Sequence, residues 1–141
     1  MRLALVLILV AAALGWWGWN RPVRPAPELI AGLSAEGLSG APCPARSIYE
    51  QDARRKRGPQ TSSVFALRLR EKFPLGTPGE ILRETLTAQG FETVTPCAND
   101  DSVLGARWRG QTWGAPDAYV YWRVDLNEKL IFLDGHVSRA D

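Results

Sequence analysis

The sequence is poor in the residues on which most enzymes and metal sites depend. It holds one histidine and two cysteines, and the cysteines are not spaced as Cys-x-x-Cys. A structural zinc site needs four such ligands, so we expect no metal. No serine has the setting of a nucleophile elbow, and no glycine-rich stretch has the spacing of a phosphate-binding loop. We therefore predict a non-enzymatic protein with no catalytic residues and no cofactor.

The chain also lacks a strong net charge, which is +2 at pH 7. Nucleic-acid-binding domains are usually far more basic, so we predict no nucleic-acid partner. One dense basic run is present, made of Arg54, Arg55, Lys56 and Arg57. No aromatic residues alternate with it, as they do in single-strand binding grooves. The run either contacts an anionic surface such as lipid headgroups or is a solvated loop.

The single long apolar run lies at the N-terminus. It extends from Leu3 to Leu14 and is followed by three tryptophans before Asn20. A retained signal-anchor would use residues 3–19, which is near the short limit for spanning a bilayer. A cleaved signal peptide would instead end at the small residues 11–13. The tryptophans favour retention at the inner membrane, because tryptophan sits well at the membrane–water boundary. Residues 1–20 are thus predicted to be a signal-anchor or a signal peptide.

Either route delivers the rest of the chain outside the cytoplasm, to the periplasm. There Cys43 and Cys97 can form a disulfide, which we favour over a reactive or metal-binding pair. Residues 21–44 are rich in Pro and Gly and are predicted to be a linker, acting as a tether or a wrapping arm. Residues 45–141 then form a small extracytoplasmic domain.

Two segments of this domain have helical composition before residue 74. The segment Ala45–Lys56 is rich in helix formers and is predicted to be a helix. The segment Ser62–Phe73 fits both an amphipathic strand and a helix. Its content of Ala, Leu, Arg, Glu and Lys favours a helix that Ser62 or Ser63 caps and Pro74 ends.

The best-specified helix follows the turn Gly76-Thr77. Thr77 is a suitable N-cap, and Glu80 would complete a capping box with it. At the other end, Gly90 can adopt the left-handed conformation that ends a helix. Phe91 can then fold back on Leu86.

Period-two alternation and turn residues predict strands after this helix. We expect them at Phe91–Cys97, Val103–Trp113, Ala118–Leu126 and Lys129–Leu133, the last ending at Asp134-Gly135. Gly114 to Asp117 is predicted to be a turn. Helices followed by an antiparallel meander indicate an α+β fold. It would have two layers, with two short helices packed on a three- to four-stranded antiparallel sheet, preceded by the N-terminal transmembrane or signal helix.

The third strand carries the candidate binding residues. Val120, Trp122 and Val124 alternate with Tyr119, Tyr121 and Arg123, so the two sets face opposite sides of the sheet. Tyrosine and arginine together are typical of protein-binding surfaces. The second set is thus either a protein-binding patch or a surface that the Ala45–Lys56 segment or the linker covers.

A different function would depend on His136, the only histidine. Asp125, Glu128 and Asp134 are its possible acidic partners around the hairpin. Such a set would suit a soluble periplasmic ligand-binding or hydrolase-like domain. Acids in and beside turns are also ordinary turn residues, so we favour the non-enzymatic prediction.

The run FPLGTPGEILRETLTAQGF, followed by a Trp/Tyr-rich hairpin, resembles uncharacterised small exported or membrane-anchored proteins of alpha-proteobacteria. The residues that carry this resemblance are Phe73, Pro74, Gly76, Thr77, Pro78, Gln89, Gly90 and Phe91. More distantly, residues 62–135 resemble the small-protein-A lipoproteins of outer-membrane protein assembly. The chain departs from these in having no lipid-attachment cysteine after the apolar run. The resemblance implies a fold and a scaffold-like envelope role, and transfers no binding residues.

Overall fold

The structure is a computed structural model that describes residues 25–35, 43, 47–56, 63–98, 100–111 and 115–139. The predicted signal-anchor or signal peptide lies outside these residues, as does much of the predicted linker. Within the described ranges, every helix is too short or too polar to cross a membrane.

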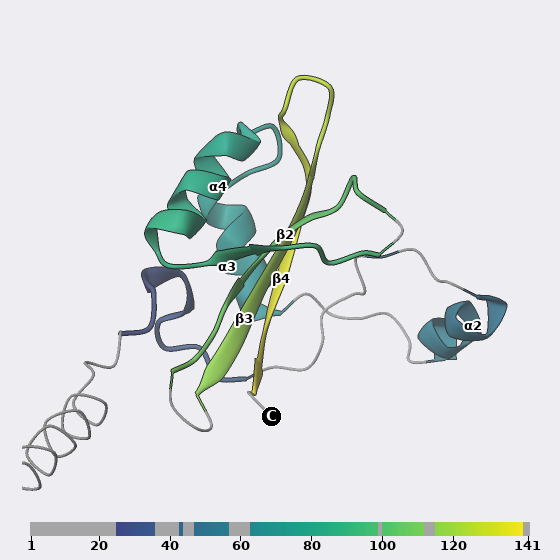
Figure 1. Cartoon of the computed structure of the whole chain (residues 1–141), viewed down its shortest axis with the longest axis horizontal. Helices are drawn as coiled ribbons and strands as arrows, with labels where there is room; N and C mark the ends of the chain where they lie inside the picture. Colours follow the sequence, from purple (N-terminus) through teal and green to yellow (C-terminus); the bar gives the residue numbers. More distant parts are fainter. Residues whose placement is uncertain are drawn as a thin grey trace, which may run out of the picture.

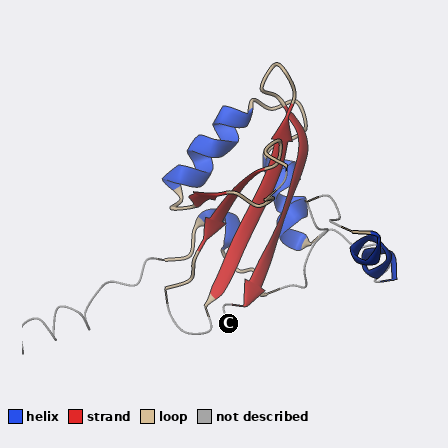
Figure 2. Ribbon diagram, turned by 45° about the vertical axis from the view of Figure 1, so that its right-hand side comes forward, coloured by secondary structure: helices blue, strands red, loops and turns tan. Residues whose placement is uncertain are grey.

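The described elements form helices first and a sheet afterwards. They are the 3-10 helix η1 (Glu28–Ile30), the helices α2 (Ile48–Lys56), α3 (Val64–Lys72) and α4 (Gly79–Ala88), and the strands β1 (Glu92–Val94), β2 (Leu104–Trp108), β3 (Pro116–Val124) and β4 (Leu130–Arg139). The strands make one antiparallel sheet in the order β1-β2-β3-β4. Helices α3 and α4 cover one face of it, whereas α2 stands apart (Figures 1 and 2). The predicted α+β class is therefore confirmed.

The hydrophobic core lies between the sheet and the two packed helices. Its fully buried members include Phe65 and Leu69 from α3, Leu82 and Leu86 from α4, and Val120, Leu133 and Val137 from the sheet. Trp122 is buried with them, as the alternation of β3 predicts. Leu29 and Ile30 of η1 also pack in this core, so part of the predicted linker belongs to the folded domain.

Helix α3 confirms the helical interpretation of residues 62–73. The Ser63 hydroxyl oxygen accepts a hydrogen bond from the Ala66 N–H at 3.0 Å, as an N-cap should. Cations on the outer side of α3 hold η1 in place. Arg68 donates to the carbonyl oxygens of Leu29 (3.1 Å) and Ala31 (2.9 Å).

The predicted capping box at the start of α4 is wrong. The helix begins at Gly79, no side chain caps it, and the Thr77 hydroxyl donates to the Pro74 carbonyl oxygen at 2.7 Å. The physical reason is that the end of the β3–β4 hairpin satisfies this segment through the backbone. The N–H groups of Gly76 and Gly79 donate to the carbonyl oxygens of Leu130 and Glu128, each at 2.8 Å, and the Leu130 N–H donates to the Thr77 carbonyl at 2.8 Å.

The predicted end of α4 is confirmed. Gly90 has φ +83°, and its N–H donates to the Thr87 carbonyl oxygen at 2.9 Å. The Phe91 N–H donates to the Leu86 carbonyl at 3.0 Å, which completes a Schellman motif. On the helix itself Leu82 and Leu86 are buried, whereas Ile81 is 48% exposed.

Several predicted strand limits are wrong. Three strands end earlier than predicted: β1 at Val94 instead of Cys97, β2 at Trp108 instead of Trp113, and β3 at Val124 instead of Leu126. Pro116 and Asp117, predicted to be part of a turn, begin β3. Strand β4 passes through Asp134-Gly135 instead of ending there. A side-chain Cβ at Gly135 would lie 2.7 Å from Leu69 Cδ1. Glycine is therefore present because α3 packs closely against the strand, and the strand does not turn at this position.

Candidate functional site

The sheet face opposite α3 and α4 brings together residues from three strands. Tyr119 of β3 lies opposite Arg107 of β2 and His136 of β4. Directly opposite residues share a face, and every second residue along a strand shares it too. We call this set the outer face, and it comprises Arg107, Asp117, Tyr119, Tyr121, Arg123, Phe132, Asp134 and His136. The predicted binding residues Tyr119, Tyr121 and Arg123 are thus on one face.

A row of stacked groups crosses the outer face. The Arg107 guanidinium carbon lies 5.1 Å from the centroid of the Tyr119 ring, in cation–π contact. On the other side, the Tyr119 and His136 rings have centroids 5.0 Å apart and planes 16° apart. Tyr121 lies next to this row, with its ring centroid 5.7 Å from that of His136.

Arg107 is fixed by a carboxylate. It forms an ion pair with Asp117, whose other oxygen accepts from the Gly110 N–H at 3.1 Å. Asp117 is buried, whereas the Arg107 side chain keeps 26% of its surface exposed. The hydrogen bond that Arg107 donates to the Asp117 carboxylate is the main reason that the pKa of Arg107 is raised. No sequence pattern indicates this pair, because Asp117 is predicted to lie in a turn and because the pairing register of two strands cannot be read from either strand alone.

His136 is in the middle of β4, not beyond the last strand as expected. It is only 6% exposed, and its Nδ1 atom has no hydrogen-bond partner among the described residues. Burial lowers the pKa of His136, and the nearby Asp134 carboxylate partly opposes this. The imidazole is therefore held in its neutral form near pH 7.

Of the three predicted acids, the structure brings only Asp134 close to His136, and Asp134 is itself engaged elsewhere. Asp125 lies six residues along β3 from the position paired with His136, which is about 20 Å at the usual rise of a strand. Its carboxylate accepts from the N–H groups of Asn127 and Lys129, which is ordinary turn chemistry. Glu128 lies in the same turn with φ 58°. Asp134 shares β4 with His136, but it accepts from the Gly135 N–H and pairs with Arg70.

The two tyrosines differ in exposure. Tyr119 is half-buried, whereas Tyr121 is 8% exposed and packs with Cys97 and Val103, against which Cys43 also lies. Burial raises the pKa of Tyr121 to about 12. Of the two alternatives left open for this face, the covered one therefore holds for Tyr121, and the predicted linker contributes Cys43 to the cover. The cover comes from the region of the two cysteines and not from the first residues of α2, which are themselves exposed.

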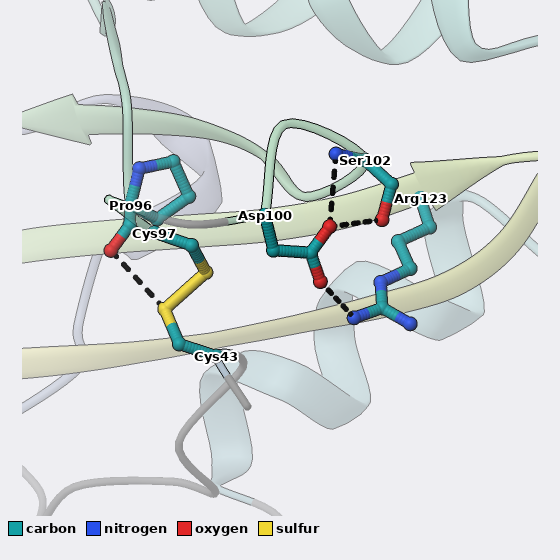
Figure 3. The surroundings of a disulfide bond; sticks show 6 residues. All are labelled: Cys43, Pro96, Cys97, Asp100, Ser102 and Arg123. Carbon is teal, nitrogen blue, oxygen red and sulfur yellow. Dashed lines mark hydrogen bonds and ion pairs between the residues drawn. A yellow bond between two sulfur atoms is a disulfide. The ribbon is translucent and has the colours of Figure 1, made fainter. Parts of the chain in front are cut away.

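The predicted disulfide is present between Cys43 and Cys97, with their Cα atoms 5.4 Å apart (Figure 3). Cys43 Sγ also lies 3.2 Å from the Pro96 carbonyl oxygen. A disulfide sulfur carries no proton, so this is a close contact and not a hydrogen bond.

The loop after Cys97 fixes the second arginine of the outer face. The Asp100 carboxylate accepts from the Ser102 N–H at 3.0 Å and from its hydroxyl at 2.6 Å (Figure 3). These bonds lower the pKa of Asp100, mainly through the Ser102 hydroxyl. The other Asp100 oxygen accepts from Arg123 at 2.9 Å. The loop thus connects β1 to β2 and also orients Arg123.

The basic run is described only in part. Lys56 is exposed and pairs with Asp52 at 2.8 Å. The side chains of Arg54 and Arg55, and all of Arg57, lie outside the described residues. In the described ranges, no group of three or more His, Cys, Asp or Glu residues is placed to hold a metal.

Comparisons of the chain with protein-family models, curated proteins and solved structures find no match. The resemblances to alpha-proteobacterial exported proteins and to small-protein-A lipoproteins therefore stay predictions.

Proposed function

We propose that the chain is a non-enzymatic cell-envelope protein that presents its folded domain in the periplasm as a protein-interaction module. Residues 3–19 would hold it at the inner membrane. The Cys43–Cys97 disulfide supports this location, because such bonds persist mainly in oxidising compartments. If residues 1–20 are removed by cleavage, the same domain would be a soluble periplasmic protein.

The observation that carries the proposal is the stacking of Arg107 on the half-buried Tyr119, with Arg123 four residues further along the same face of β3. Each arginine is held by a carboxylate, Arg107 by Asp117 and Arg123 by Asp100. Tyrosine and arginine are enriched among the residues that dominate binding energy. Side chains that are already fixed lose less conformational entropy when a partner binds. The outer face is therefore suited to protein recognition.

The free edge of β4 is less suited to binding an added strand. The carbonyl oxygen of Leu133 accepts from Arg70 Nε at 2.9 Å, and that of Gly135 accepts from the Ser63 hydroxyl at 2.6 Å. The Gly135 N–H donates to its neighbour Asp134 at 2.9 Å. Strand addition needs such backbone groups to be available. Because these backbone groups already form hydrogen bonds within the domain, we favour the outer face over this edge as the protein-binding surface.

The alternative is a soluble periplasmic ligand-binding or hydrolase-like domain that uses His136 and nearby acids. It has weaker support, because Asp134 pairs with Arg70 and Asp125 is engaged in the hairpin turn. Complementation of a deletion strain with His136→Gln tests it. Full rescue by a variant that accumulates to the normal level would remove this alternative.

In-cell photo-crosslinking tests the main proposal. A photoreactive phenylalanine analogue is placed at Phe132, which is half-buried on the outer face, or at Ile81 on α4 as a control on the opposite layer. We expect a specific protein adduct from position 132 and none from position 81. Adducts of equal yield at both positions, or none above background at 132, would overturn the proposal.

A substitution then maps the contact. Tyr119→Ala is expected to reduce the adduct by about thirtyfold, as loss of a hot-spot side chain does. Tyr49→Ala is the matched control, because Tyr49 is 82% exposed on α2. It should leave the adduct unchanged. Circular dichroism of both variants excludes loss of the fold as the cause.

A further inference from the structure

Strand β1 leaves one edge of the sheet without hydrogen-bond partners in the described part of the chain. In the sheet order, β1 has a neighbour only on the side of β2. Alternate residues of an antiparallel strand bond to the neighbouring strand, and the residues between them direct their N–H and C=O groups the other way. Among the described residues, residues 92–95 form backbone hydrogen bonds only within the pairing with β2. The outward groups of β1 are therefore available for a partner.

The two edges of the sheet differ in this respect. On β4, the carbonyl oxygens of Leu133 and Gly135 already accept hydrogen bonds from side chains of the helical layer. On β1, three of the four side chains of residues 92–95 are exposed to solvent, so the edge is open to an incoming chain. A row of free backbone groups with the spacing of a strand is complementary to another extended backbone.

The surroundings of β1 fix where such a backbone can lie. Pro96 ends the edge, because proline has no N–H to donate and because its ring packs over Gly105, where a Cβ would lie 3.0 Å from Pro96 Cδ. At the other end, the edge opens into a groove of about 320 Å³, lined in part by Gly90, Glu92 and Trp108. An added strand would thus pair along residues 92–95 and have space for a side chain in the groove.

The charge at the groove favours a basic side chain. Glu92 is exposed, and its cross-strand neighbour Arg107 is already paired with Asp117. Helix α4 ends beside the groove and has no basic residue in its last turn, so the negative end of its dipole is not offset there. Arg109 also lines the groove, but its side chain is exposed and can turn into solvent. The groove therefore offers a carboxylate and a helix C-terminus to an incoming cation.

The same charge disfavours a second copy of the chain as the occupant. Pairing of two β1 strands would bring two Glu92 carboxylates to one edge, and β1 has no basic residue to face either of them. Charged side chains on edge strands commonly prevent such self-pairing. A separate strand with a basic residue beside Glu92 gains from opposite charge instead.

We propose that β1 takes up an extended, basic peptide segment of a protein partner as an added strand, with a lysine or arginine side chain beside Glu92. The inference rests on the proposed function, because it requires a protein partner, and it specifies how that partner docks. Glu92 lies opposite Arg107, so the added strand borders the outer face. One partner can therefore cover the outer face and extend the sheet.

Selection of short random peptides displayed on phage supplies a probe. The full chain is immobilised in detergent micelles, and enriched peptides are synthesised and titrated by fluorescence polarisation. We expect the enriched peptides to carry lysine or arginine. Glu92→Gln should weaken their binding about twofold to fivefold, as loss of an exposed ion pair does. Glu84→Gln removes an exposed acid of α4 and is the matched control, which should leave the affinity unchanged.

Methylation of the peptide backbone tests strand pairing itself. In an added strand, every second N–H bonds to β1 and the others point away. N-methylation should therefore weaken binding by about tenfold at alternate positions and have little effect at the positions between them. Hydrogen exchange followed by mass spectrometry should show slower exchange of residues 92–95 when the peptide is bound, and unchanged exchange in β4.

The outcomes separate this inference from the proposed function. Absence of enriched peptides, an N-methylation pattern without a period of two, or unchanged exchange of residues 92–95 overturns the β1 site. Protection of these residues that rises with protein concentration, without peptide, identifies a second copy as the occupant and also overturns the proposal. If these tests fail while the adduct at Phe132 forms, only the β1 site is rejected, whereas absence of that adduct rejects the proposed function.

Discussion

Reduction of the Cys43–Cys97 disulfide is expected to remove a large part of the free energy of unfolding. The bond joins positions 54 residues apart in sequence. In the chain-entropy model, opening a loop of this length costs about 4 kcal/mol at 25 °C, because the unfolded chain regains its freedom. Single domains unfold with about 5–15 kcal/mol in total, so the reduced protein should be close to its stability limit.

Urea unfolding followed by tryptophan fluorescence measures this loss. Oxidised and reduced wild-type protein are compared with the double variant Cys43→Ala and Cys97→Ala. The variant should match the reduced protein, and reductant should not change it further. The slope of unfolding free energy against urea should rise when the bond opens, because the unfolded chain then exposes more surface.

One result would refute this reasoning. A loss below about 1 kcal/mol with an unchanged slope would mean that the loop is not released in the unfolded state, contrary to the entropy estimate. A fluorescence change before the main transition would instead show that the cover over Tyr121 detaches first. The core around α3 and α4 would then unfold later and with a smaller loss of stability.

Three further predictions concern the sheet. Burial lowers the pKa of His136 in the folded state below its unfolded value of about 6.5. The neutral imidazole therefore contributes its full share of the free energy of unfolding above that pH. This contribution should be lost as the pH falls below about 6.5, by at most about 1.4 kcal/mol per pH unit. The variant His136→Gln should therefore show a flatter dependence of the unfolding free energy on pH. Gly135→Ala places a Cβ 2.7 Å from Leu69, and calorimetry should show destabilisation by about 1–3 kcal/mol. Asp117→Asn weakens a partly exposed ion pair with Arg107, and urea unfolding should show that the free energy of unfolding falls by about 1–3 kcal/mol. An unchanged free energy of unfolding would contradict the conclusion that Asp117 fixes Arg107.

Local chemistry was sufficient to predict several elements. Ser63 and Gly90 act within one helical turn of themselves, so their roles as cap and stop can be read from neighbouring residues. The alternation in β3 predicts which side chains share the face toward the helices, and Trp122 is buried on that face. The disulfide could be predicted because only two cysteines are present.

Other features depend on contacts between distant residues. Asp134-Gly135 has the composition of a turn, but the close approach of Leu69 explains the glycine. Thr77 is a residue type that often caps helices, but the backbone of the β3–β4 hairpin already forms hydrogen bonds with residues 76–79. The stacking of Arg107 on Tyr119 depends on strand register, which no local pattern reports.

The backbone hydrogen bonds between residues 76–79 and the start of β4 have a consequence for motion. The end of the hairpin cannot separate from residues 76–79 without breaking the bond that the Gly79 N–H donates to the Glu128 carbonyl oxygen at the first turn of α4. Opening of the hairpin end and fraying of α4 therefore form one event. Their amides should lose protection with the same free energy and together, as parts of one cooperative unit do. Two elements some fifty residues apart in sequence thus share a single local stability.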